Sequence, residues 1–83
     1  MKIFKYKITG EYSILMPKGA QILTAQLQGE DICIWAQCDP GEELAPRRVI
    51  LYGTGWEMEE GVNHSYISTV RQGPFVWHVF EVI

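Results

Sequence analysis

The sequence lacks the features that mark membrane, secreted and nucleic-acid-binding proteins. No stretch approaches the roughly 20 apolar residues that span a bilayer. The N-terminal segment, with Lys2, Lys5 and Lys7 among apolar residues, has no unbroken apolar core of a signal peptide. A formal net charge of −3 is mild, and the lysines and arginines are not clustered as contacts to a phosphate backbone require. We therefore expect a cytoplasmic protein that binds neither a membrane nor a nucleic acid.

Cysteine is scarce, and its two copies are poorly placed for a disulfide or a metal site. Cys33 and Cys38 lie an odd number of residues apart on one predicted strand, so their side chains point to opposite faces. Two free thiols in a reducing compartment are the simpler interpretation. Together with His64 and His78, the cysteines show none of the paired spacings of zinc sites. No metal or other cofactor is predicted.

Helical periodicity is also missing, whereas the alternation typical of strands recurs along the chain. The length of 83 residues indicates one domain, residues 1–83, and the 47% apolar content argues against disorder. Short alternating segments separated by turn residues favour an all-β fold, a small antiparallel β-sandwich or open barrel of six to seven strands. The predicted strands are Ile3–Ile8, Tyr12–Met16, the two strands of a hairpin within Gln21–Asp39, Arg47–Gly53, Ser65–Arg71 and Phe75–Ile83.

The segment Gln21–Asp39 carries the strongest fold signal. Gly29 and Glu30 suit a two-residue type II′ turn, which matches the twist of the flanking strands. With that turn, one face of the hairpin is apolar, and a slip of one residue would turn this face to water. The predicted pairs are Gln28 with Asp31, Leu27 with Ile32, Gln26 with Cys33, Ala25 with Ile34, Thr24 with Trp35, Leu23 with Ala36 and Ile22 with Gln37.

The segments between the strands are predicted to be turns and loops. Thr9-Gly10-Glu11 is a turn, Asp39–Pro46 is a loop, and Trp56–Ser65 is irregular and acidic. Gly53-Thr54-Gly55 is also a turn, because the further glycines, the lysine and the helix of a phosphate-binding loop do not follow.

Two histidines fit structural roles better than catalytic ones. His78 lies on the last strand, which is apolar on both faces and is therefore expected inside a sheet. We expect His78 to be packed with one nitrogen hydrogen-bonded, and His64 to be solvated in a polar loop. No nucleophile, base and orienting carboxylate occur at a recognisable spacing, so no catalytic residue is predicted. Loss of turnover in His78→Ala would be the test of the weaker enzyme hypothesis.

Tryptophan and arginine side chains are the candidates for binding a protein partner. Trp35 falls on the polar face of the hairpin, where it is either covered by a second layer or exposed as a contact residue. Trp56 begins an irregular loop, a common place for binding residues. Arg47 and Arg48 form a small basic step that could hold an acidic partner or a phosphate. The structural alternatives are a role in a small core for the tryptophans and a solvated strand edge for the arginines.

An alternative hypothesis is a site for a small anionic ligand such as a nucleotide. Guanidinium groups and aromatic rings bind such ligands. The chain offers Arg47, Arg48, Tyr52, Trp56 and Arg71 for this purpose.

Several segments, in this order, resemble a known family. They are Met16–Leu23, Cys33–Ala36 with Asp39-Pro40, Arg48–Gly55, Tyr66–Val70 and Val76–Glu81. They are similar to a family of small proteins of unknown function, of about this length, from phages, prophages and their bacterial hosts. The chain departs from the family pattern at 56–58, where a turn containing His-Pro is common. No catalytic or binding residue can be transferred from such a family.

The resemblance implies a biological context for the protein. It suggests a small accessory protein that acts in a bacterial cytoplasm, and such proteins commonly bind a host component, sequester a small molecule or join a particle. Because no catalytic constellation is recognisable, we favour a non-enzymatic protein that binds a host or phage protein, with inhibition of a host or defence factor as one role. A homodimer is also predicted, because the apolar last strand and the aromatic residues leave more apolar surface than one small sheet hides.

Overall fold

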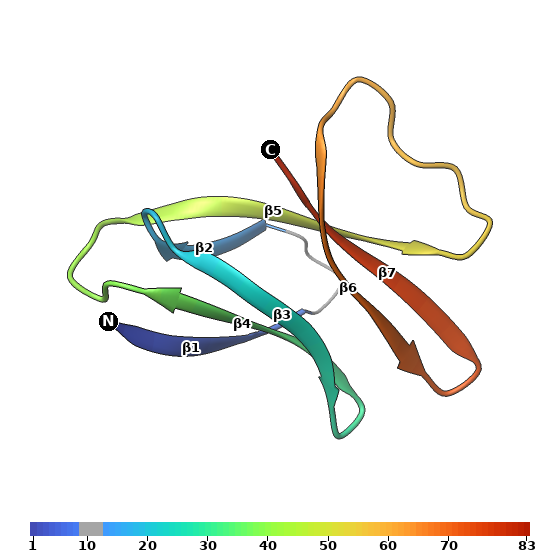
Figure 1. Cartoon of the computed structure of the whole chain (residues 1–83), viewed down its shortest axis with the longest axis horizontal. Coiled ribbons are helices and arrows are strands. Elements are labelled where there is room, and N and C mark those ends of the chain that lie inside the picture. Colours follow the sequence, from blue (N-terminus) through green and yellow to red (C-terminus); the bar gives the residue numbers. More distant parts are fainter. Residues whose placement is uncertain (9–12) are drawn as a thin grey trace.

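The computed structural model describes residues 1–8 and 13–83, which form two packed layers of antiparallel strands (Figure 1). One layer is a three-stranded sheet in the order β1 (Lys2–Lys7), β4 (Asp31–Cys38) and β3 (Gln21–Gln28). The other is a four-stranded sheet in the order β2 (Ser13–Pro17), β5 (Leu44–Gly53), β7 (Phe75–Val82) and β6 (His64–Gln72). The prediction of an all-β fold is confirmed. Of the two predicted forms, the structure is the β-sandwich, because the two sheets do not close into a barrel.

The described residues form no helix, and they therefore contain no helix long and apolar enough to cross a membrane. The molecule measures 39 × 34 × 18 Å. The shortest dimension matches two sheets stacked about 10 Å apart with their outward side chains.

The central hairpin has the predicted turn and most of the predicted register. Gly29, the first of the two turn residues, has a φ of 63°. Glu30, the second, has no positive φ, like every other non-glycine residue in the described chain. A positive φ at the first turn position alone is the type II′ pattern. The pairs from Gln28 with Asp31 to Thr24 with Trp35 are as predicted.

Beyond Thr24 the predicted register is wrong, because β3 contains a bulge at Leu23. Ile22, and not Leu23, lies opposite Ala36, and Gln21 lies opposite Gln37. A bulge adds one residue to one strand and exchanges the faces of the residues beyond it. Ile22 thereby packs on the core while Leu23 is exposed.

The strand β5 begins earlier than predicted. The segment up to Pro46 was expected as a loop, yet β5 starts at Leu44, and Pro46 lies opposite Leu15 of β2. The pairing of β5 with β7 extends only to Arg48 opposite Val82. One side of β5 is therefore free of a neighbouring strand at Pro46, where a residue without an N–H is tolerated.

The predicted strands at the N-terminus are confirmed within the described residues. β1 spans Lys2–Lys7 and is an edge strand, where its exposed lysines discourage pairing with other chains. The N–H of Ile8 still bonds the carbonyl of Ile32 at 2.9 Å. The turn expected at Thr9-Gly10-Glu11, and Tyr12, lie outside the described residues.

The core lies between the two sheets in two connected groups. The larger contains Ile8, Ala25, Ile32, Ile34, Val49, Val70 and Val79. The smaller contains Met16, Ala20, Ala36 and Cys38. Along one side of the sandwich β3 lies beside β6. β7 lies between β5 and β6, so the expected interior position of the last strand is confirmed.

Candidate functional site

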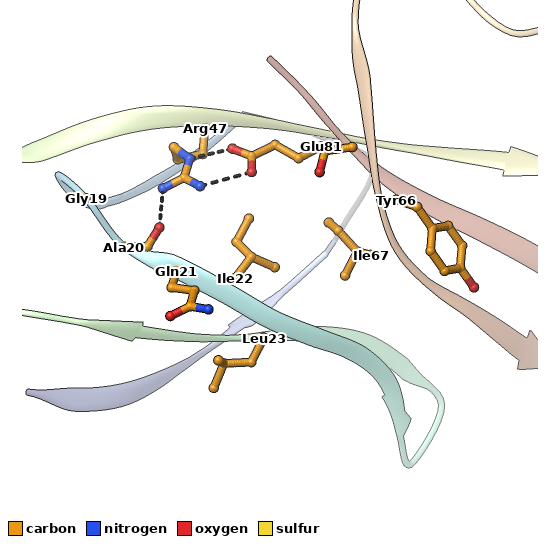
Figure 2. Close-up of a pocket in the computed structure, with 10 residues that line it drawn as sticks. Gly19, Ala20, Gln21, Ile22, Leu23, Arg47, Tyr66, Ile67 and Glu81 are labelled. Atoms are coloured by element: carbon orange, nitrogen blue, oxygen red, sulfur yellow. Dashed lines mark hydrogen bonds and ion pairs between the residues drawn. The ribbon is translucent and has the colours of Figure 1, made fainter.

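Arg47 lies on the inner face of the four-stranded sheet, where it forms an ion pair. Its Nε and Nη2 donate to the two carboxylate oxygens of Glu81 in β7, and its Nη1 donates to the carbonyl of Ala20 at 2.7 Å (Figure 2). The side chains of Arg47 and Glu81 are only 24% and 12% exposed. Hydrogen bonding to Glu81 raises the pKa of Arg47 above its ordinary value, although burial acts in the opposite direction.

This ion pair closes one end of a polar hollow between the sheets. The hollow has a volume of about 380 Å³ and is lined mainly by residues of β3 and β6 around the bulge at Leu23 and an irregularity in β6 at Ile67. Figure 2 shows Arg47 and Glu81 directed toward each other across its upper part. Three donor nitrogens of Arg47 bond within the protein, so the guanidinium is held as a structural group.

The other residues proposed for a small anionic ligand are not brought together. Arg48, Tyr52 and Arg71 share the outer face of the four-stranded sheet, whereas Arg47 lies on the inner face. Arg48 pairs with Val82 of β7, and Arg71 pairs with Val76 of the same strand. The two arginines are therefore roughly 20 Å apart along the strand direction. Arg48 also donates to Glu59 at 2.7 Å.

Tyr52 is buried beneath the loop between β5 and β6, although it lies on the outer face. Its hydroxyl accepts the N–H of Glu59 at 2.9 Å and lies 2.8 Å from Nε2 of His64. The rings of Tyr52, His64 and Tyr66 each pack edge-to-face with Phe80. The solvated position expected for His64 is therefore wrong, because this residue begins β6 and joins an aromatic cluster.

His78 is also bonded more fully than expected. Its Nε2 lies 2.8 Å from the hydroxyl of Thr54, and its Nδ1 lies 3.2 Å from the hydroxyl of Thr69. Both ring nitrogens have a partner where one was predicted, because the turn after β5 brings Thr54 over the outer face.

Trp35 is half-buried on the outer face of the three-stranded sheet, between Lys5 of β1 and Thr24 of β3. The two cysteines are unpaired, as predicted, and both are buried. Within the described ranges, no group of histidine, cysteine or acidic side chains is arranged to hold a metal ion.

Trp56 is the sequence-predicted aromatic candidate that the structure leaves exposed, whereas Trp35 is half-buried and Tyr52 is buried. The N–H of Trp56 bonds the carbonyl of Gly53 at 3.1 Å, which confirms the predicted turn and folds the indole back over Gly53. A Cβ at Gly53 would lie only 2.7 Å from this ring, so the close approach requires glycine. Trp56 nevertheless remains 60% exposed.

Aromatic rings from β7 extend this surface. The indole of Trp56 meets Trp77 edge-to-face with the ring centroids 5.4 Å apart, and Phe75 stacks on Trp77 at 5.7 Å. Phe75 is 57% exposed, and Nε1 of Trp77 donates to the side chain of Gln72 at 3.0 Å. We call the surface formed by Leu27, Trp56, Pro74, Phe75 and Trp77 the aromatic end.

Two open hollows meet on the aromatic end. One, of about 290 Å³, lies between the turn after β5 and the start of β7. The other, of about 520 Å³, lies between the tips of the β3–β4 and β6–β7 hairpins. Pro74 and Phe75 line both. The two hairpin tips lie near each other (Figure 1). They are held together because the side-chain amide of Gln72 donates to the carbonyl of Glu30 at 2.8 Å.

Sequence reasoning identified Trp56 but missed Phe75, Trp77 and Leu27. Phe75 and Trp77 were assigned to an interior strand, which is correct for most of β7. Its first two residues, however, extend beyond the end of β5, whose last pair is Gly53 with Trp77. The available signal was an aromatic residue directly after the Gly73-Pro74 turn, since side chains beside hairpin tips are often exposed.

Comparisons with known proteins place the chain in a family. Neither the curated proteins nor the solved structures give a match. A family model matches residues 1–83, the whole length of the chain. The protein therefore belongs to the family described as Domain of unknown function (DUF7352).

Proposed function

We propose that the protein is a non-enzymatic accessory protein of phage or prophage origin that binds a protein partner through its aromatic end. In this proposal it acts in the cytoplasm of the bacterial host, where the partner is a host or defence factor that it inhibits. The observation that carries the proposal is the exposure of Trp56 and Phe75 beside two hollows. Tryptophan and other aromatic residues dominate the binding energy of many protein interfaces.

Trp56 serves this role better than the other three residues proposed for partner binding. Trp35 is half-buried within a sheet face, Arg47 is bonded to Glu81, and Arg48 is bonded to Glu59. An exposed aromatic ring held rigidly by a neighbour loses little conformational freedom on binding. Trp56 meets that condition because it lies over Gly53 and against Trp77.

Capture of partners from a host lysate by the tagged protein tests this proposal. Trp56→Ala should weaken capture of the partner by about tenfold or more, because a central aromatic residue contributes about 2 kcal/mol or more to binding. Tyr66→Ala is the matched control, since Tyr66 is 61% exposed and also has an edge-to-face partner, Phe80, at 5.5 Å. Equal capture by the wild type and by a folded Trp56→Ala variant would contradict the proposal.

The alternative of an anionic nucleotide ligand has less support, because its five residues lie on different faces and two of the arginines bond carboxylates. Native mass spectrometry of the protein purified from its host would detect such a ligand as a small mass lost on denaturation.

The homodimer also stays a prediction. Within one chain, β7 is covered on one face by the opposite sheet and on the other by Tyr52 and His64. Light scattering at micromolar concentration measures the mass and so distinguishes a monomer from a homodimer.

A further inference from the structure

The rings of the aromatic end form ridges with hollows between them. The planes of Trp56 and Trp77 are inclined by 84°, whereas Phe75 lies nearly parallel to Trp77 at 24°. Trp56 and Trp77 line the first hollow, and Phe75 lines both hollows. Aromatic-lined grooves of this kind on small β domains accept the rings of extended polyproline II segments.

The hollows have few polar groups that a bound segment would need to satisfy. Apart from Glu30, Gln72 and Thr54, their lining is glycine, proline, aliphatic and aromatic. The side chain of Gln72 bonds Trp77 and Glu30, and the hydroxyl of Thr54 bonds His78. A proline-rich segment suits such a surface, because proline has no backbone N–H and is already extended before binding.

Two exposed acidic residues belong to the segments that form the aromatic end. Glu57 follows Trp56 directly, and Glu30 lines the second hollow; both are exposed. Neither forms an ion pair with a described residue, whereas Asp31 pairs with Lys7.

Arg47 lies on the same face of the four-stranded sheet as Phe75, but its guanidinium is paired with Glu81 near the other end of β7. Arg71 lies opposite Val76 in the register, and its side chain therefore points to the other face of the sheet from Phe75. A cationic partner segment is favoured by this field and by the net charge of −3.

We infer that the aromatic end binds an extended, proline-containing segment of a partner protein that carries arginine or lysine beside its prolines. This inference rests on the proposed function and specifies its partner. Trp56 and Phe75 separate the positions taken by successive prolines, and Glu57 and Glu30 attract the basic residues at the two ends.

Calorimetric titration with defined peptides at low ionic strength tests the inference. The probe is an oligoproline peptide with an arginine at each end. One comparison peptide has glutamates in place of the arginines, and another keeps the arginines but replaces proline by glycine and serine. We expect the first peptide to bind more tightly than either of the others. Amide chemical shifts of the wild type should change at residues 53–57 and 75–77, a readout that requires no variant.

Variants assign the contacts. Trp56→Ala or Phe75→Ala should weaken binding of the arginine-flanked oligoproline by about tenfold or more, and Tyr66→Ala should leave it unchanged. Combining Glu57→Gln with Glu30→Gln should weaken it about two- to fivefold, an effect lost at high salt. Glu42→Gln, on the exposed loop between β4 and β5, is the matched neutralisation and should have no effect.

The inference is overturned if the arginine-flanked oligoproline does not bind, if the glycine–serine peptide binds equally well, or if the shifts map elsewhere. If partner capture is still lost in Trp56→Ala while the peptide does not bind, the proposed function stands and only the partner class is wrong. If capture is also unaffected, both fail.

Discussion

The ion pair between Arg47 and Glu81 differs from the surface pairs of this protein in its burial. Arg47 joins β5 to β7 through Glu81 and to the turn before β3 through the carbonyl of Ala20. By contrast, Lys18 and Glu43 form a pair whose side chains are 61% and 79% exposed. Removing one partner of a half-buried pair leaves the other charge poorly solvated, whereas an exposed pair loses little.

We therefore predict that Glu81→Gln lowers the free energy of unfolding by about 1–3 kcal/mol, because Arg47 keeps its burial and loses its charged acceptor. Glu43→Gln, the control, should change it by less than about 0.5 kcal/mol. Urea denaturation of both variants at neutral pH provides the measurement. Equal losses in the two variants would show that burial of the Arg47 pair has no energetic consequence.

At the scale of elements, the loop between β5 and β6 is fastened across the outer face by a few polar contacts. The hydroxyl of Tyr52 accepts the N–H of Glu59, and Arg48 donates to the carboxylate of Glu59. The loop contains Trp56, so its attachment also helps to orient one side of the aromatic end. Its side chains are otherwise mostly exposed.

Tyr52→Phe should release this loop while keeping the aromatic packing. We expect the free energy of unfolding to fall by about 1 kcal/mol, since one hydrogen-bonded hydroxyl is removed. Hydrogen exchange at Glu59 should become faster, because its N–H loses its acceptor. The control is Tyr66→Phe, which removes a hydroxyl bonded to Thr69 at an exposed site and should alter neither quantity. An unchanged exchange rate at Glu59 in Tyr52→Phe would refute the role given to this hydroxyl.

At the scale of the whole molecule, one side of the sandwich is joined by hydrogen bonds between edge strands of different sheets. The hydroxyl of Ser68 in β6 accepts the N–H of Ala25 in β3 at 2.9 Å and lies 3.1 Å from the hydroxyl of Thr24. The pairing register of β6 shifts between Tyr66 and Ser68, at the point where β6 meets β3. The irregularity directs Ser68 toward the other sheet.

Ser68→Ala should lower the free energy of unfolding by about 1–3 kcal/mol, because the N–H of the fully buried Ala25 is left without its acceptor. Ser65→Ala, a change at an exposed position of the same strand, serves as the control and should have little effect. Chemical denaturation followed by tryptophan fluorescence measures both. A loss no larger than that of Ser65→Ala would show that this hydrogen bond does not stabilise the joined edges.

The amino-acid sequence by itself determined which segments form strands, several of the turns and the register of the central hairpin near its tip. These features depend on period-two alternation and on the backbone preferences of glycine and proline, which act over a few residues. The type II′ turn at Gly29 and the turn after Gly53 were predictable for this reason. The bulge at Leu23 was not, because it depends on how β3 packs against the other layer.

Only the tertiary structure decided which side chains share a surface. The order β2, β5, β7, β6 places the turn after Gly53 beside Phe75, and it places Arg47 beside Glu81, 34 residues away in sequence. Alternation assigns a residue to one face of its strand but does not say which strand lies next to it. The sequence therefore indicated Trp56 as a candidate, whereas Phe75 and the aromatic end emerged from the pairing of β5 with β7.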